Sequence, residues 1–147
     1  VDGCAVEVKI KEGRTGEIQG QNIDMPSNNS DYNGNKIIRI ASTKCPSTVE
    51  TIAKEKLEHM VKGKLVEVFF SDYNDIKTNK IVGQLIVTEN GKDAGLEQLK
   101  SGMVRFRCDK EKTISGADRR KYKDAEKGAK VLKIGIWSNE NNTVLRQ

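Results

Sequence analysis

The sequence contains no apolar run that approaches the roughly 18 residues needed to cross a membrane, so insertion into a bilayer is excluded. Its first residues, "VDGCAVEVKI", have neither a basic start nor an apolar core, so no signal peptide is visible. The three cysteines, Cys4, Cys45 and Cys108, form no CxxC pair, which argues against a zinc site. Their odd number leaves at least one thiol free or paired between chains. We therefore expect a reduced, intracellular protein, located in the cytoplasm with the nucleus as a second location.

Histidine and aromatic residues are also scarce. The single histidine, His59, has no partner at metal-ligand spacing and is interpreted as a surface residue. In 147 residues, 35% are hydrophobic and 32% are charged, which is typical of one polar globular domain. The net charge of +5 permits nucleic acid or another polyanion as partner. A lysine-rich surface that only keeps the protein soluble is an alternative explanation of the same charge.

The periodicity of apolar residues predicts alternating strands and helices. Strands are expected at 1–10, 36–42, 64–71, 80–89 and 103–108, and residues 11–36 read as a long loop with a short strand near Glu17 to Gln19. A capping box of Ser47 and Glu50 predicts a helix that ends at Gly63. Asp93 is expected to cap a short helix over 94–102, and a longer helix is expected over about 117–132. This order predicts an α+β domain with a small closed barrel and helices outside it.

Two of these helices have a predicted apolar face. In the first helix it comprises Val49, Ile52, Ala53, Leu57, Met60 and Val61, and in the last it comprises Tyr122, Ala125, Ala129 and Leu132. Trp137, which follows in "IGIWS", is interpreted as a core residue that anchors the last helix, with a ligand platform as the alternative.

Four segments resemble, in the right order, motifs of the staphylococcal-nuclease-like family. "VDGCAVEV" is similar to its "DGDT" strand motif, and "IIRIASTKCPS" is similar to its "R-L-x-G-I-D-x-P-E" strand and corner. "NGKDAGLEQLKSGMV" and "KYKDAEKGAKVLKIGIWS" resemble its later helix segments, which end in Gly-Ile-Trp. The resemblance implies an OB-fold five-stranded barrel with three helices. It also implies one domain over 1–147, with a flexible insertion at about 11–36, that is a fragment of a longer protein.

Active members of that family cleave phosphodiester bonds with calcium held by carboxylates, a glutamate that activates water and two arginines on the phosphate. These residue types suit the reaction, because calcium prefers hard oxygen ligands and the transition state is highly charged. By the resemblance, the two metal-binding aspartates fall on Cys4 and Lys44 and the glutamate on Ser47. One arginine is retained as Arg39, and Lys80 is the only candidate for the other. The base-stacking aromatics fall near Cys108 and Lys110 and are lost.

With those carboxylates replaced, we expect no catalytic residues, no metal and no cofactor, and calcium only if the chain is an unconventional nuclease. The loss of the general base alone lowers the rate on the order of 10²–10⁴-fold. The Lys44-Cys45-Pro46 corner resembles degenerate domains of Tudor-SN proteins, which implies RNA binding or scaffolding in RNA metabolism, transcriptional coactivation or the RNA-induced silencing complex. The implied partners are RNA or single-stranded nucleic acid, and proteins bound through tandem domains.

Basic residues supply a candidate binding surface for such a partner. Four of them recur on one side of the last predicted helix, and others follow strands near the corner; the full set is Arg39, Lys44, Arg105, Arg107, Arg120, Lys123, Lys127 and Lys130. A solvated helix face is the simpler explanation of the helical stripe, and Arg39 is open to a structural role in bonding neighbouring carbonyls. Cys45 is interpreted as an inert corner residue.

Two other functions stay open at this point. An active calcium-dependent nuclease could recruit Asp24 and Asp31 from the inserted segment as ligands. A domain that binds only proteins would fit the fold motifs without any role for the basic residues.

Overall fold

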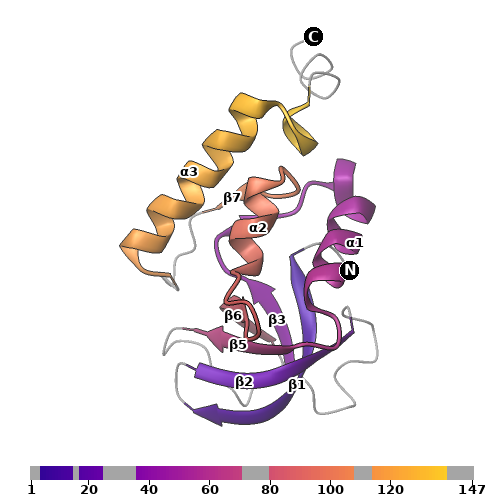
Figure 1. Ribbon diagram of the computed structural model, residues 1–147, viewed down its shortest axis with the longest axis vertical. Helices are drawn as coiled ribbons and strands as arrows, with labels where there is room; N and C mark the ends of the chain where they lie inside the picture. The colour runs from indigo at the N-terminus through magenta and orange to yellow at the C-terminus, as the bar shows by residue number, and fades with distance from the viewer. Residues whose placement is uncertain (1–3, 15–16, 25–35, 71–79, 108–113, 139–147) are drawn as a thin grey trace.

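The computed structural model describes residues 4–14, 17–24, 36–70, 80–107 and 114–138. Five of its strands form a closed barrel in the order β1-β2-β5-β6-β3, with β3 pairing back onto β1. Figure 1 shows the barrel at one end of the molecule and the helices at the other. The α+β fold with an OB-type barrel and three helices, expected from the sequence, is therefore confirmed. The barrel strands are β1 (Ala5–Arg14), β2 (Glu17–Asp24), β3 (Lys36–Ile40), β5 (Leu65–Phe69) and β6 (Lys80–Val87).

Barrel closure depends on pairings between segments that are distant in sequence. Four of the five pairings are antiparallel, whereas β3 and β6 run parallel, with Ile38 opposite Ile81. The connection between these two parallel strands contains the first helix, as a parallel crossover requires. The closed barrel leaves none of its five strands as an unpaired edge.

The prediction of a loop over 11–36 was wrong for most of the part that the structure describes. β1 continues to Arg14, and β2 covers Glu17–Asp24 where only a short strand was expected. β2 lies between β1 and β5 and completes the barrel. The reason for the error is physical: this segment is rich in Gly, Asn and Gln, and pairing on both sides supplies the strand stability that its own propensity lacks. Residues 25–35 lie outside the described part.

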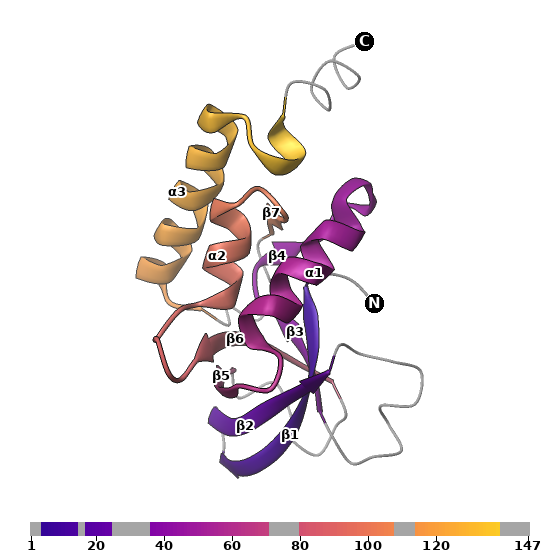
Figure 2. The same cartoon turned by 45° about the vertical axis from the view of Figure 1, so that its right-hand side comes forward.

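Three helices cover the barrel end. They are α1 (Glu50–Val61), α2 (Ala94–Lys100) and α3 (Gly116–Leu132), and short 3₁₀ turns occur at Ser47–Val49 (η2) and Gly135–Trp137 (η3). Figures 1 and 2 both place α2 between the other two helices. Gln98 of α2 donates to the Ala53 carbonyl of α1 at 2.9 Å, which joins these two helices. None of the helices that the structure describes is long and apolar enough to cross a membrane.

Helix boundaries agree with the sequence signals at three points and differ at one. Asp93 caps α2 by accepting from the Leu96 N–H, and Ser115 caps α3 by accepting from the Asp118 N–H. Gly63 adopts a left-handed conformation, with φ +75°, directly after the C-cap of α1, where the helix was expected to end. The expected capping box of Ser47 is wrong, because Ser47 begins η2, and α1 starts at Glu50 with no side-chain cap.

The main core fills the barrel and is covered by α1. Strand residues such as Val6, Ile38 and Leu85 are fully buried, and Leu57 and Val61 of α1 pack against them. A second cluster beneath α2 and α3 contains Leu99, Val104 and Tyr122. The predicted apolar faces were each one residue too wide: Ile52 is 58% exposed and Leu132 is 69% exposed, since each lies beyond the surface that its helix packs on.

The last predicted strand, 103–108, is shorter than expected and lies outside the barrel. Only Arg105–Phe106 (β7) is a strand, and it pairs antiparallel with β4 (Thr43–Lys44) in a separate two-stranded sheet. This small sheet joins the corner after β3 to the segment that follows α2.

Two glycines attach the C-terminal turn to the end of α2. Gly102 and Gly135 both have positive φ, of 72° and 59°, and the Ile136 N–H donates to the Gly102 carbonyl at 2.8 Å. A Cβ on Gly102 would meet the Ile134 carbonyl oxygen, and one on Gly135 would meet the Gly102 carbonyl oxygen. Only residues without a side chain allow this close backbone approach.

We predict that Gly102→Ala lowers the free energy of unfolding by at least about 2 kcal/mol. The strain of a positive φ adds to the steric overlap of the new Cβ with the Ile134 carbonyl. Gly91→Ala is the matched control: Gly91 has φ +68°, but an added Cβ there would meet no atom within 4 Å, so only the strain of about 1 kcal/mol applies. Urea unfolding measures both. Equal losses in the two variants would show that the close approach is unimportant.

Candidate functional site

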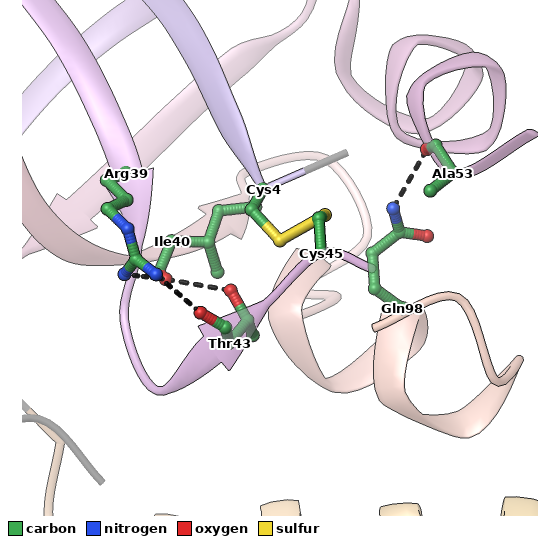
Figure 3. The surroundings of a disulfide bond; sticks show 7 residues. All are labelled: Cys4, Arg39, Ile40, Thr43, Cys45, Ala53 and Gln98. Atoms are coloured by element: carbon green, nitrogen blue, oxygen red, sulfur yellow. Dashed lines mark hydrogen bonds between the residues drawn. A yellow bond between two sulfur atoms is a disulfide. The ribbon is translucent and has the colours of Figure 1, made fainter. Parts of the chain in front are cut away.

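A disulfide bond between Cys4 and Cys45 joins the start of β1 to the corner that follows β4 (Figure 3). The two Cα atoms are 6.0 Å apart, within the range that a disulfide spans. The bond encloses 41 residues of sequence separation, and closing such a loop stabilises a fold by about 4 kcal/mol in the chain-entropy model.

Cys45, interpreted from the sequence as an inert corner residue, is thus disulfide-bonded, and the bond weakens the argument for a reduced compartment. The large sequence separation of the two cysteines gives no local signal that they pair. A signal was present, however: the resemblance places Cys4 and Lys44, the neighbour of Cys45, at two positions that hold one metal ion in active relatives. Residues that bind one metal ion are close in space, so Cys4 and Cys45 were candidates for pairing.

Arg39 extends from β3 beneath the same corner (Figure 3). Its guanidinium donates to the Thr43 carbonyl at 2.7 Å and to the Ile40 carbonyl at 3.4 Å, and the Thr43 hydroxyl also donates to the Ile40 carbonyl. Because buried carbonyls need donors, these bonds support a structural role for Arg39 in holding the corner.

Lys44 is exposed on β4, directly opposite Arg105 on β7. Side chains directly opposite each other in an antiparallel pair project on the same face of the sheet. The two cations therefore share one face, and like charges so close together favour an anionic partner between them.

Trp137 lies next to this face and is contacted by two cations. The Arg105 guanidinium lies 4.6 Å and the Lys130 ammonium 4.8 Å from the centre of its ring. Each such cation–π contact stabilises by about 0.5–1 kcal/mol at an exposed site. Trp137 itself is only 9% exposed and packs on Ala129 and Ile136, which confirms its prediction as a core anchor.

Lys123 of α3 extends this surface, because it lies seven residues before Lys130 on the same side of the helix; its ammonium lies 5.7 Å from the ring centre of Phe106. We call Lys44, Arg105, Lys123 and Lys130 the cationic surface; three elements, β4, β7 and α3, contribute to it. Glu126 is its acidic neighbour: it accepts from the Phe106 N–H at 2.8 Å and lies 3.6 Å from the Lys130 ammonium. Glu126 thus fixes β7 to α3.

The remaining predicted residues are less closely grouped. Arg107 is exposed directly after β7, and Arg120 and Lys127 are exposed on α3 one turn from Lys123. Ser47 and Lys80 are placed only by their backbones, in η2 and at the start of β6. His59 is exposed on α1, as predicted.

The residues at the metal positions implied by the resemblance do not fit calcium. Cys4 is bonded to Cys45, and sulfur is in any case a soft ligand that suits calcium poorly. Lys44 carries a positive charge, which repels a cation. Over the described ranges, no group of three His, Cys, Asp or Glu side chains is placed to hold a metal ion. Of the alternative ligands, Asp31 lies outside these ranges, and Asp24 is placed only by its backbone, at the end of β2.

A second candidate site is a depression of about 350 Å³ between α2, α3 and β6. At its base, Asp93 accepts from the Tyr122 hydroxyl and from the Gln84 amide, each at 2.8 Å. Burial raises the pKa of Asp93. Burial and the nearby Asp93 carboxylate both raise the pKa of Tyr122. Both Asp93 oxygens already have donors, since Asp93 also caps α2. This network therefore holds three elements together and offers no free base.

The barrel, the three helices and the position of the corner define a nuclease-like OB-fold domain. The family model of staphylococcal nuclease homologues matches residues 18–139, which is most of the chain. The chain belongs to the staphylococcal nuclease family, and this membership points to a nucleic-acid-binding or nuclease-like function. No curated protein matches it.

The raised pKa of Asp93 predicts a specific pH dependence of stability. A carboxyl whose pKa is higher in the folded state contributes stability below its unfolded pKa of 3.8, and this contribution is lost as pH rises through the folded pKa. The wild type minus Asp93→Asn difference in unfolding free energy should therefore fall between pH 3 and pH 7. Urea titrations across this range measure it.

Tyr122→Phe serves as the companion variant. It removes a hydrogen bond to the carboxylate, so the pKa of Asp93 should rise further. The decline of the stability difference should then extend to higher pH. A difference that is flat or increases with pH would contradict the role of Asp93 burial.

Proposed function

We propose that this domain binds single-stranded nucleic acid, in particular RNA, through the cationic surface and does not hydrolyse it. The observation that carries the proposal is the placement of Lys44 opposite Arg105, beside the corner that the resemblance assigns to metal and phosphate, with Arg105 and Lys130 held against Trp137. The arrangement exchanges a metal-centred phosphate site for one made of fixed cations.

Fixed cations suit a phosphate backbone for two reasons. Arg105 and Lys130 lie against an aromatic ring, so less side-chain entropy is lost when they meet a phosphate. Neutralised phosphates release counterions, which supplies affinity that does not depend on base sequence. Contacts to the phosphate backbone of the nucleic acid should therefore give affinity with little sequence specificity.

The proposed absence of hydrolysis is supported by the chemistry at the carboxylate positions. Cys4 in a disulfide and an exposed Lys44 supply no hard anionic oxygen, and serine at position 47 is no general base at neutral pH. Asp24 and Asp31 remain the candidate ligands of an unconventional nuclease.

A role as one domain of a Tudor-SN-type protein is part of the proposal. Its support is the Lys44-Cys45-Pro46 corner together with the family membership. In that setting, tandem domains would supply protein partners, and the functions would be in RNA metabolism or transcriptional coactivation. Cytoplasmic location stays a prediction; the disulfide is more typical of an oxidising compartment.

We predict salt-dependent binding of a fluorescent 20-nucleotide single-stranded RNA by the full chain. Lys44→Ala and Lys123→Ala should each weaken binding several-fold at 50 mM salt. Each should also reduce the slope of log K against log[salt] by about 0.7, the value for one phosphate contact to a single strand. Fluorescence anisotropy at 50–200 mM salt measures both quantities.

Lys56→Ala is the matched control, since it removes the same charge from an exposed position on α1, beside His59 and Lys64 and away from the cationic surface. Equal effects of all three variants would indicate only a response to net charge. No binding at 50 mM salt would favour a domain that binds proteins alone.

We further predict that calcium neither binds the purified protein nor induces cleavage. The melting temperature should be the same in 5 mM calcium and in chelator, because a ligand of the folded state would raise it. RNA and DNA should remain intact in both.

Calcium-dependent cleavage would overturn this part of the proposal. Asp24→Asn combined with Asp31→Asn should then abolish the cleavage if the inserted segment supplies the ligands. Cleavage that survives both changes would point to a different metal site or to a contaminating nuclease, which an independent preparation distinguishes.

A further inference from the structure

We propose that the Cys4–Cys45 disulfide controls the cationic surface, so that nucleic-acid binding is strong in the oxidised protein and weaker in the reduced one. This inference rests on the proposed function, to which it adds a means of regulation. It starts from the position of Cys45, which directly follows Lys44 and begins the segment that leads to α1.

One half of the disulfide is fixed and the other belongs to a short connection. Cys4 is 3% exposed in the core beneath α2 and α3, and its carbonyl accepts from the Ile40 N–H at 2.7 Å. Cys45 is only half-buried and is followed by Pro46 and η2. The disulfide thus ties a connecting segment to a rigid part of the barrel (Figure 3).

The other end of this segment contacts the tryptophan on which the cations are stacked. Val49, at the end of η2, packs against the cluster of Ala129, Ile136 and Trp137. Trp137 in turn holds Arg105 and Lys130. The segment 45–49 is therefore anchored by the disulfide at its start and by the Trp137 cluster at its end.

In the part of the chain that the structure describes, hydrogen bonds hold the corner as far as β4. Arg39 donates to the Thr43 carbonyl, the Ala41 N–H donates to the Gly83 carbonyl and the Arg107 N–H donates to the Ser42 carbonyl. These bonds remain after reduction, so the barrel is expected to persist. Reduction should therefore loosen only residues 45–49. Lys44, which precedes this segment, and the surroundings of Trp137, which contact its last residue, should change as a result.

Reduction itself is an ordinary thiol–disulfide exchange. The thiolate of a dithiol attacks the half-buried Cys45 sulfur, and the buried Cys4 sulfur leaves and takes up a proton. The second thiolate of the reductant then releases Cys45, which is also protonated. The protein gains two electrons and two protons, and the reductant closes its own disulfide.

The experiment uses the full chain with Cys108→Ser, which removes the third cysteine. Trp137 is the only tryptophan in the sequence, so its fluorescence reports on the cationic surface without a label. Oxidised and dithiothreitol-reduced protein are compared for Trp137 emission, far-UV circular dichroism and anisotropy with the single-stranded RNA probe. Hydrogen exchange locates the change along the chain.

Reduction is expected to shift Trp137 emission to longer wavelength and to accelerate exchange in 45–49, while the barrel strands stay protected. RNA binding at 50 mM salt should weaken by about fivefold to tenfold, and its salt slope should decrease by about 1.4, as two lost phosphate contacts predict. Cys4→Ser combined with Cys45→Ser should match the reduced protein and no longer respond to reductant.

Three outcomes would contradict the proposal or its basis. Equal binding and emission in the two redox states overturn redox control and leave the proposed function intact. Loss of the far-UV signal on reduction also overturns it, because the disulfide then holds the whole fold and not the surface. Failure of the oxidised protein to bind RNA overturns the proposed function, and the emission and exchange data then decide alone whether the disulfide controls the surface.

Discussion

The packing around Trp137 is the interaction on which the rest of the site depends. Its ring is buried against Ala129 and Ile136 and at the same time supports Arg105 and Lys130. One side chain thus joins the C-terminal turn, α3 and β7, and through Val49 it also contacts the segment before α1. An apolar ring that orders cations combines core stability with a binding surface.

The corner after β3 is held by hydrogen bonds and by a covalent bond. Here Arg39 bonds the carbonyls of Ile40 and Thr43, and a disulfide connects the corner to β1. These bonds order the corner next to Lys44.

The fold was largely predictable because its strands and helices carry strong local signals. β-branched runs at β3, β5 and β6, and the caps Asp93 and Ser115, identify their elements from sequence alone. β2 was underestimated because its stability comes from pairing with β1 and β5, which no local pattern records. The site was less predictable for the same reason. Basic residues were evident, but their grouping around Trp137 and the Cys4–Cys45 bond depend on contacts between segments distant in sequence.

The attachment of η3 to Gly102 bears on how the chain folds during synthesis. The turn at Gly135–Trp137 docks on the end of α2, more than thirty positions earlier, and brings the ring that supports Arg105. Until residue 137 has left the ribosome, α3 lacks its anchor and β7 lacks the ring above Arg105. The barrel strands are complete much earlier, so the nascent domain should pass through a stage with a formed barrel and an unassembled cationic face.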